Sequence, residues 1–82
     1  MPHTYILFSE KLNNYYVGST SNINRRIEDH NRGKENFKST GMPWSIAYSE
    51  TFGNLADARR REFQIKKQKS RSYIERLIAQ AG

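Results

Sequence analysis

The chain is organised around the segment Tyr15-Tyr16-Val17-Gly18-Ser19-Thr20, which continues through residues 21–33 as SNINRRIEDHNRG. Its aromatic and β-branched residues end at a glycine, which predicts a short strand over residues 15–18. Small polar residues follow that can cap a helix, and the next residues predict a helix over 23–31 that ends at 31–33. This unit also carries arginine and histidine beside apolar residues, so it is the first candidate for a functional site.

The predicted helix has polar side chains on its apolar face. Ile23, Arg26, Ile27 and His30 occur at positions i, i+3, i+4 and i+7, which form one stripe on a helix. Arg26 and His30 therefore share the face that packs inward. The outward-facing side chains are expected to be Arg25, Glu28 and Asp29.

Length and composition narrow the class of protein. The 82 residues are predicted to form a single domain spanning 1–82, because a chain of this size cannot support two cores. Its 14 Lys and Arg against 8 Asp and Glu give a net charge of +6, which favours a polyanionic partner such as nucleic acid. The absence of cysteine excludes disulfides and thiolate sites. No apolar run approaches the roughly 20 residues of a membrane span and no secretion signal opens the chain, so a cytoplasmic location is expected.

A first strand is predicted over residues 4–9, which are rich in β-branched and aromatic residues and carry no charge. Asn13 and Asn14 tolerate the positive φ of a tight turn, so this strand and residues 15–18 form a hairpin. The parity of the loop decides which side chains share a face. An even-length loop puts Tyr16 and Gly18 on the face of Tyr5, whereas an odd-length loop substitutes Tyr15 and Val17.

The second half of the chain predicts a strand over residues 44–52, with Trp44, Ile46 and Tyr48 on one side, and a helix over residues 55–69. The apolar stripe of that helix runs through Leu55, Ala58, Glu62 and Ile65, with Phe63 widening it. Ser70 caps a last helix over residues 71–79, and residues 33–41 form a polar loop. The fold class is therefore α/β (α+β), with a three-stranded, mainly antiparallel sheet flanked by helices in the order β-β-α-β-α-α.

Arg26, His30 and Glu62 are polar groups at positions where apolar residues are expected. Buried charges are costly unless they are paired, so one interpretation is a structural ion pair between Arg26 and Glu62 beside a hydrogen-bonded histidine. The other interpretation is a metal-dependent nuclease. Such a site needs a carboxylate for a divalent cation, a fork-shaped cation for the phosphate and a proton acceptor, which Glu62, Arg26 and either Tyr16 or His30 provide.

The two strands also carry a pair of motifs. The triplets His3-Thr4-Tyr5 and Tyr16-Val17-Gly18 resemble the Gly-Ile-Tyr and Tyr-Ile-Gly triplets of the GIY-YIG nuclease domain family, and their tyrosines are eleven residues apart. The chain is similar to small free-standing bacterial members and to the N-terminal nuclease domain of the excinuclease nicking subunit. This resemblance selects the even-length loop, with Tyr16 facing the site.

The resemblance extends over essentially the whole chain. Arg26 and His30 match the family's arginine and histidine, ten and fourteen residues after Tyr16, and Glu62 matches the metal-binding glutamate of a later helix. It implies a DNA endonuclease, nicking or structure-selective, with Mg²⁺ or Mn²⁺ on Glu62 and a role in DNA repair or recombination. The implied catalytic residues are Tyr5, Tyr16, Arg26, His30 and Glu62, and the residues expected to bind DNA are Arg25, Arg32, Lys34, Lys38, Lys66 and Lys67.

The chain departs from the family pattern in two places. His3 replaces the glycine of the first triplet, and no asparagine follows Asn54, although many members carry one after the glutamate helix. The second departure keeps an alternative open, in which the chain is a nucleic-acid-binding module or a partner-dependent adaptor with little catalysis of its own. The sequence does not predict the oligomeric state.

Overall fold

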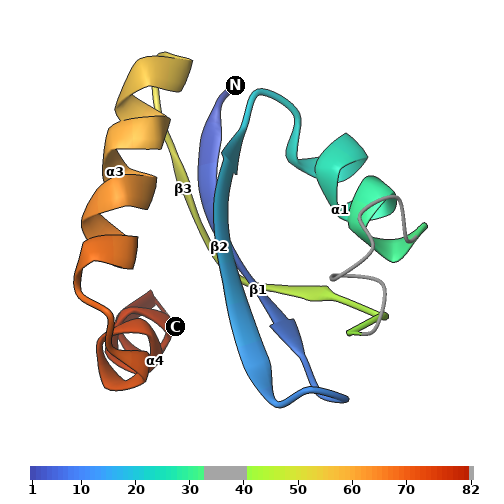
Figure 1. Ribbon diagram of the computed structural model, residues 1–82. Coiled ribbons are helices and arrows are strands. Elements are labelled where there is room, and N and C mark those ends of the chain that lie inside the picture. The colour runs from blue at the N-terminus through green and yellow to red at the C-terminus, as the bar shows by residue number, and fades with distance from the viewer. Residues whose placement is uncertain (33–40, 82) are drawn as a thin grey trace.

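Strand β1 (His3–Ser9) forms the centre of a three-stranded sheet in the computed structural model, which describes residues 1–32 and 41–81. Its neighbours are β2 (Asn14–Thr20) and β3 (Ser45–Thr51), both antiparallel to it, in the order β2-β1-β3. The helices are α1 (Ile23–Asn31), α3 (Leu55–Lys67) and α4 (Arg71–Ala81). The predicted fold class and element order are confirmed, and β2 lies at an edge of the sheet (Figure 1).

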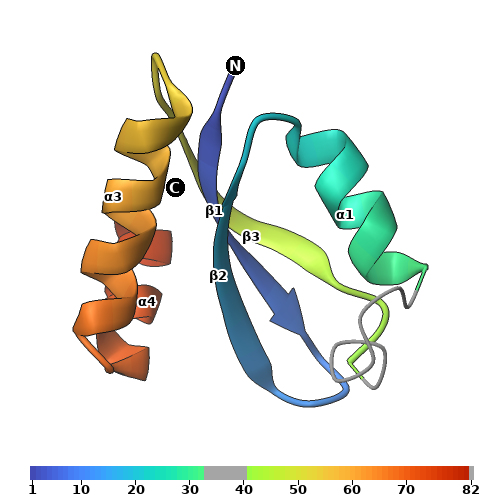
Figure 2. The same ribbon diagram turned by 45° about the horizontal axis from the view of Figure 1, so that its top comes forward.

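The sheet is covered on both faces. Helix α1 packs on one face, and α3 and α4 pack on the other (Figures 1 and 2). Successive side chains of a strand point to opposite faces, so the apolar run of β1 serves two cores. Tyr5 and Leu7 pack with Trp44 beneath α1, whereas Ile6 packs with Val17 and Ile65 beneath α3. No helix in residues 1–32 and 41–81 is long and apolar enough to cross a membrane.

The hairpin between β1 and β2 has the even-length loop. Tyr5 pairs with Gly18 and Leu7 pairs with Tyr16, so Tyr16 lies on the face covered by α1. Asn13 adopts a positive φ of 50° in the turn, and its N–H donates to the Glu10 carbonyl at 3.3 Å. This agrees with the register that the family resemblance selected.

Strand β3 corrects one expectation. Tyr48 pairs with Ile6 and Ile46 pairs with Leu7, so the register shifts by one residue at this point. A bulge of this kind inserts an extra residue, which moves the side chains beyond it to the other face. Trp44 therefore packs beneath α1 and Tyr48 beneath α3 and α4. The prediction that Trp44, Ile46 and Tyr48 share one side was wrong, because the bulge interrupts the alternation.

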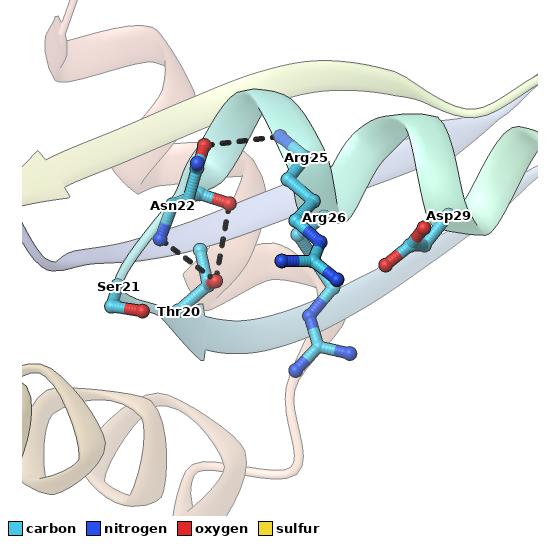
Figure 3. Close-up of a pocket in the computed structure, with 6 residues that line it drawn as sticks. All are labelled: Thr20, Ser21, Asn22, Arg25, Arg26 and Asp29. Atoms are coloured by element: carbon cyan, nitrogen blue, oxygen red, sulfur yellow. Dashed lines mark hydrogen bonds between the residues drawn. The ribbon is translucent and has the colours of Figure 1, made fainter.

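Each helix begins at a side chain that caps it, and Ser70 is the cap predicted for the last helix. The Asn22 side chain accepts a hydrogen bond from the Arg25 N–H at 3.1 Å, which starts α1 (Figure 3). Asn54 accepts from the Asp57 N–H at 2.8 Å and starts α3. Ser70 accepts from the Tyr73 N–H at 3.2 Å at the start of α4. The predicted loop 33–41 lies outside the described residues except for Gly41.

Helix α3 does not bury all of the predicted apolar stripe. Ala58 and Ile65 are buried, but Phe63 is 67% exposed. The expectation that Phe63 widens the inward face was therefore wrong. Ala58 and Ile65 point towards the sheet, and Phe63 points into solvent because it lies on a different side of the helix.

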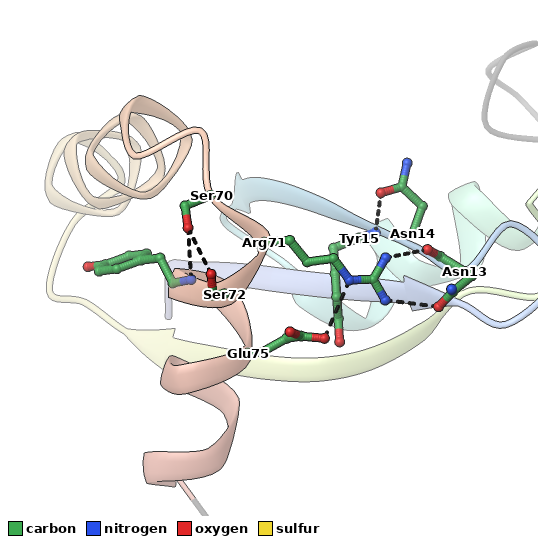
Figure 4. Close-up of polar contacts among 8 residues, drawn as sticks. Asn13, Asn14, Tyr15, Ser70, Arg71, Ser72 and Glu75 are labelled. Atoms are coloured by element: carbon green, nitrogen blue, oxygen red, sulfur yellow. Dashed lines mark hydrogen bonds and ion pairs between the residues drawn. The ribbon is translucent and has the colours of Figure 1, made fainter.

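Helix α4 is attached to the β1–β2 hairpin by Arg71. Its guanidinium donates to the Asn13 carbonyl at 2.6 Å and to the Asn13 side-chain oxygen at 2.9 Å (Figure 4). The same group lies 5.0 Å from the centre of the Tyr15 ring and 3.4 Å from the Glu75 carboxylate. This side chain thereby connects the turn of the hairpin to the first turn of α4.

A row of polar residues across the sheet holds α3. Thr4 pairs with Ser19 on β2 and with Glu50 on β3, so these three side chains lie side by side on the α3 face. The Thr4 hydroxyl donates to the Ala58 carbonyl at 2.6 Å. The Ser19 hydroxyl donates to Glu62 at 2.5 Å.

At the β3 end of this row, Arg61 Nε donates to both Glu50 oxygens at 3.1 Å. The Tyr48 hydroxyl donates to the same carboxylate at 2.5 Å. Burial and the adjacent Glu50 raise the pKa of Tyr48. Burial lowers the pKa of Arg61, but hydrogen bonds to Tyr73 and Glu50 outweigh it, and the net shift is upward. The helix is therefore fixed over all three strands.

Replacing Gly18 with alanine is expected to destabilise the fold. A Cβ on Gly18 would lie 2.6 Å from Cζ of Tyr5, a buried ring that has little room to move. We expect Gly18→Ala to lower the free energy of unfolding by about 1–3 kcal/mol, as overpacking does in other cores. Urea unfolding followed by circular dichroism measures this change.

Gly53→Ala is the matched control, because a Cβ at Gly53 meets no described atom within 4 Å. Equal unfolding midpoints for Gly18→Ala and Gly53→Ala would contradict the close approach of Tyr5 to β2.

Candidate active site

Strand β2 supplies side chains to both faces of the sheet edge. Tyr16 and Gly18 pair with Leu7 and Tyr5 and face α1. Ser19 pairs with Thr4 and faces α3, where it meets Glu62. The predicted site residues therefore approach the same edge strand from opposite sides.

Aromatic rings surround Tyr16 on the α1 face. The Tyr16 and His30 ring centres are 5.0 Å apart, with the rings edge to face. Tyr5 lies 6.4 Å from Tyr16 and 6.3 Å from His30. His30 and Tyr5 are buried at 3% and 2% exposure, whereas Tyr16 is only partly buried. Tyr16 is thus the member of this group with access to a ligand.

Trp44 completes the aromatic group, and the sequence did not reveal it as part of the site. Its ring lies 6.3 Å from Tyr16 and 6.4 Å from His30. The Asn31 side chain accepts from the Trp44 N–H at 2.6 Å and donates to the Trp44 carbonyl at 3.1 Å. Asn31 follows His30 directly, so these two bonds fix the end of α1 against the start of β3 and position both rings.

Glu62 lies on the other side of β2. Its carboxylate accepts from the Ser19 hydroxyl at 2.5 Å and from Lys66 Nζ at 2.6 Å, and its side chain is 21% exposed. Lys66 Nζ also lies 5.9 Å from the centre of the Tyr16 ring. Lys66 therefore connects the carboxylate to the tyrosine across the edge of the sheet. Ser19 and Lys66, and not Arg26, are the partners that the structure gives to Glu62.

Arg26 lines a pocket at the start of α1 (Figure 3). The pocket has a volume of about 270 Å³ and is lined by Thr20, Ser21, Asn22, Arg25, Arg26 and Asp29. Figure 3 shows the Arg25 and Arg26 side chains extending in the same direction from the first turns of the helix. Two guanidinium groups beside the positive end of a helix dipole favour an anion such as a phosphate, and they outnumber the one carboxylate of the pocket, Asp29.

The remaining residues predicted to bind DNA are spread over the surface. Arg32 is exposed at the end of α1, with Glu28 at 3.8 Å, and Lys67 is exposed at the end of α3. Lys66 takes part in the contacts of Glu62 described above. Lys34 and Lys38 lie outside the described residues.

The donor set for a metal ion consists of one carboxylate. Residues 1–32 and 41–81 contain no cluster of three or more His, Asp or Glu side chains that could hold a metal. Glu62 is partly exposed and lines a pocket together with Arg59, Phe63 and Lys66. A single carboxylate fits Mg²⁺, which keeps most of its water ligands, and does not fit a cation that needs a full protein cage.

Two contacts of this site carried a signal in the sequence that was not used. Strand alternation already places Ser19 on the opposite face from Tyr16 and Gly18, which is the face that the glutamate helix must cover. The spacing of Glu62 and Lys66 is i, i+4, which brings the two side chains together on a helix. The pairing of Asn31 with Trp44 carried no such signal.

The chain is similar to known proteins in sequence. The pattern of the GIY-YIG catalytic domain family matches residues 1–75. A UPF0213 protein of Staphylococcus haemolyticus is 37% identical over 65 residues, which cover 78% of this chain and 79% of that protein. A UPF0213 protein of Halobacterium salinarum is 35% identical over 79 residues, which cover 95% of this chain and 100% of that protein.

A solved structure agrees with these sequence matches. The solution NMR structure of a UPF0213 protein from Bacillus halodurans is similar to the chain with a TM-score of 0.61 and 28% identity. The similarity covers 100% of this chain and 87% of that one. The chain therefore belongs to the GIY-YIG catalytic domain family, which is a family of nucleases.

Proposed function

We propose that the chain is a single nuclease domain that hydrolyses phosphodiester bonds in DNA as an endonuclease, with one Mg²⁺ or Mn²⁺ ion. The observation that carries this proposal is the contact chain across β2. Ser19 and Lys66 hold the Glu62 carboxylate, and Lys66 also lies 5.9 Å from the Tyr16 ring. The residues that we propose as metal ligand and proton acceptor, Glu62 and Tyr16, thus lie on two sides of the edge strand β2.

Arg26 is assigned to the scissile phosphate. A guanidinium presents N–H groups in a fork that matches two phosphate oxygens, and it stabilises the charge that develops as the bond breaks. Arg25 lines the same pocket and would bind a neighbouring phosphate. The pocket therefore supports binding of a DNA backbone without reading its bases.

Tyr16 and His30 are assigned to proton transfer. Tyr16 is the partly exposed member of the aromatic group, and it would help to activate the attacking water. His30 packs against its ring with centres 5.0 Å apart and would assist that transfer. Tyr5 is buried beneath both rings, where it orients them.

Glu62 would hold the divalent ion. When bound, the ion would supply positive charge to the phosphate and lower the pKa of a bound water. Lys66 neutralises the carboxylate when no cation is there, since its ammonium lies 2.6 Å from the Glu62 Oε2 atom. A cation held by Glu62 would replace Lys66 as the charge partner of the carboxylate, and Lys66 would then be available to a DNA phosphate.

The substrate class follows from charge. The net charge of +6 and the basic residues of α1 and α3 favour DNA binding that is sensitive to salt and insensitive to sequence. We therefore propose that the chain selects DNA by its shape, for example at branched or damaged sites. Such selection agrees with a role in repair or recombination.

A second function is that of a nucleic-acid-binding module, or of an adaptor that depends on a partner protein, with the same fold and little turnover. Two observations favour it. No asparagine follows Asn54 in the chain, and both oxygens of Glu62 already have partners in Ser19 and Lys66.

Removing either half of the site is expected to abolish cleavage. We expect Tyr16→Phe and Glu62→Gln each to lower the rate of nicking by about 100-fold or more, as loss of an acid–base group does. The measurement uses supercoiled plasmid and a branched DNA, each incubated with Mg²⁺ or Mn²⁺ and resolved on gels.

Tyr15→Phe and Glu75→Gln are the matched controls. Tyr15 precedes Tyr16 but faces α4, and Glu75 is exposed on α4 beside Arg71. Both controls should cleave at the wild-type rate. Equal cleavage by wild type, Tyr16→Phe and Glu62→Gln would refute the proposal that the chain is an endonuclease. If all three proteins bind DNA and none cleaves it, the result would favour the binding module.

Metal binding provides a test that does not depend on turnover. Mn²⁺ is expected to broaden the amide NMR signals of Ser19, Glu62 and Lys66, because a paramagnetic ion affects only its neighbours. The broadening should disappear in Glu62→Gln. Broadening that persists in this variant, or that occurs only at residues far from Glu62, would contradict the assigned metal ligand.

A further inference from the structure

Phe63 is the only aromatic residue of α3, and its side chain is 67% exposed. The core side of the helix is formed by Ala58 and Ile65 instead. Single exposed apolar side chains are ordinary on protein surfaces, so exposure alone does not mark a site. The surroundings of the ring decide what it can bind.

Two cationic side chains and the proposed metal ligand surround the Phe63 ring. Arg59, Glu62, Phe63 and Lys66 line one pocket of about 350 Å³. Their spacing of i, i+3, i+4 and i+7 places them on one face of the helix. The ring therefore lies between two cations, next to the carboxylate that we assign to the metal ion.

We infer that Phe63 stacks on an unpaired base of the DNA, so that the substrate carries a single-stranded nucleotide beside the bond that is cut. This inference rests on the proposed function and specifies its substrate. An aromatic face flanked by Arg or Lys is the arrangement that binds single strands, because the ring stacks on a base and the cations contact adjacent phosphates. Within a duplex the faces of the bases are already stacked and are not accessible to the ring.

Charge favours a nucleotide over a protein partner at this position. Protein–protein interfaces are depleted of Lys and Glu near their centres, and Phe63 is surrounded by Arg59, Glu62 and Lys66. A polyanion is attracted to Arg59 and Lys66, which line the pocket on either side of the ring.

The test measures binding without cleavage. Two DNAs of the same sequence are compared in EDTA by fluorescence anisotropy. One is fully paired, and the other carries a single-stranded flap with 2-aminopurine at its first unpaired position. The variants are Phe63→Leu, which removes the ring, Phe63→Tyr, which keeps it, and Ile46→Ala, which removes another exposed apolar side chain on the far strand β3.

Wild type, Phe63→Tyr and Ile46→Ala should bind the flap DNA more tightly than the duplex and lower the 2-aminopurine fluorescence. Phe63→Leu should bind the duplex as before, bind the flap DNA at least about five-fold more weakly and leave the fluorescence unchanged, because stacking on one base is lost. Equal weakening on both DNAs, or no change, would overturn the inference.

Cleavage by the same proteins separates this inference from the proposed function. If wild type prefers flap DNA through Phe63 but cuts neither DNA with Mg²⁺ or Mn²⁺, the nuclease proposal fails and the stacking role stands. If wild type cuts and Glu62→Gln does not, while Phe63→Leu keeps the full preference for flap DNA, the stacking role fails alone.

Discussion

The position of α3 over the sheet depends on one row of hydrogen bonds. Ser19, Thr4 and Glu50 are neighbours on three strands, and each bonds a different residue of the helix, Glu62, Ala58 and Arg61 in turn. Thr4 is fully buried, so its bond to the Ala58 carbonyl satisfies a hydroxyl that would otherwise be costly to bury. Glu62 follows Ala58 by one helical turn, and the row therefore fixes the distance of its carboxylate from β2.

The edge strand divides the proposed site because side chains of a strand alternate. Tyr16 faces the aromatic group of α1, and Ser19 faces the carboxylate of α3. A slip of one residue in the β1–β2 register would exchange these faces and separate Tyr16 from His30. Arg71 stabilises the register from outside, since it bonds Asn13 in the turn and stacks on Tyr15. The family motif Tyr16-Val17-Gly18 therefore favours this register of the β1–β2 pair, because Gly18 leaves room for the Tyr5 ring.

The parts of the structure that the sequence predicts are those with local causes. The helix starts follow from the caps Asn22, Asn54 and Ser70, each of which bonds its own first turn. The family resemblance was needed to decide whether the hairpin loop has an even or an odd number of residues, because the composition of the turn allows both. The bulge in β3 and the exposure of Phe63 were not predictable, since they depend on how elements far apart in the chain pack against one another. The pairing of Asn31 with Trp44 was missed for the same reason.

We propose that Tyr16 and Glu62 act as one catalytic unit across β2. A double-mutant cycle in plasmid nicking tests it with Tyr16→Phe, Glu62→Gln and the combined variant. Residues of one catalytic unit are strongly non-additive, because the first substitution already removes what the second would remove. We expect the combined variant to nick at about the rate of the slower single variant. Losses that multiply in the combined variant would mean that the two residues act independently, and would contradict a single site built across the edge strand.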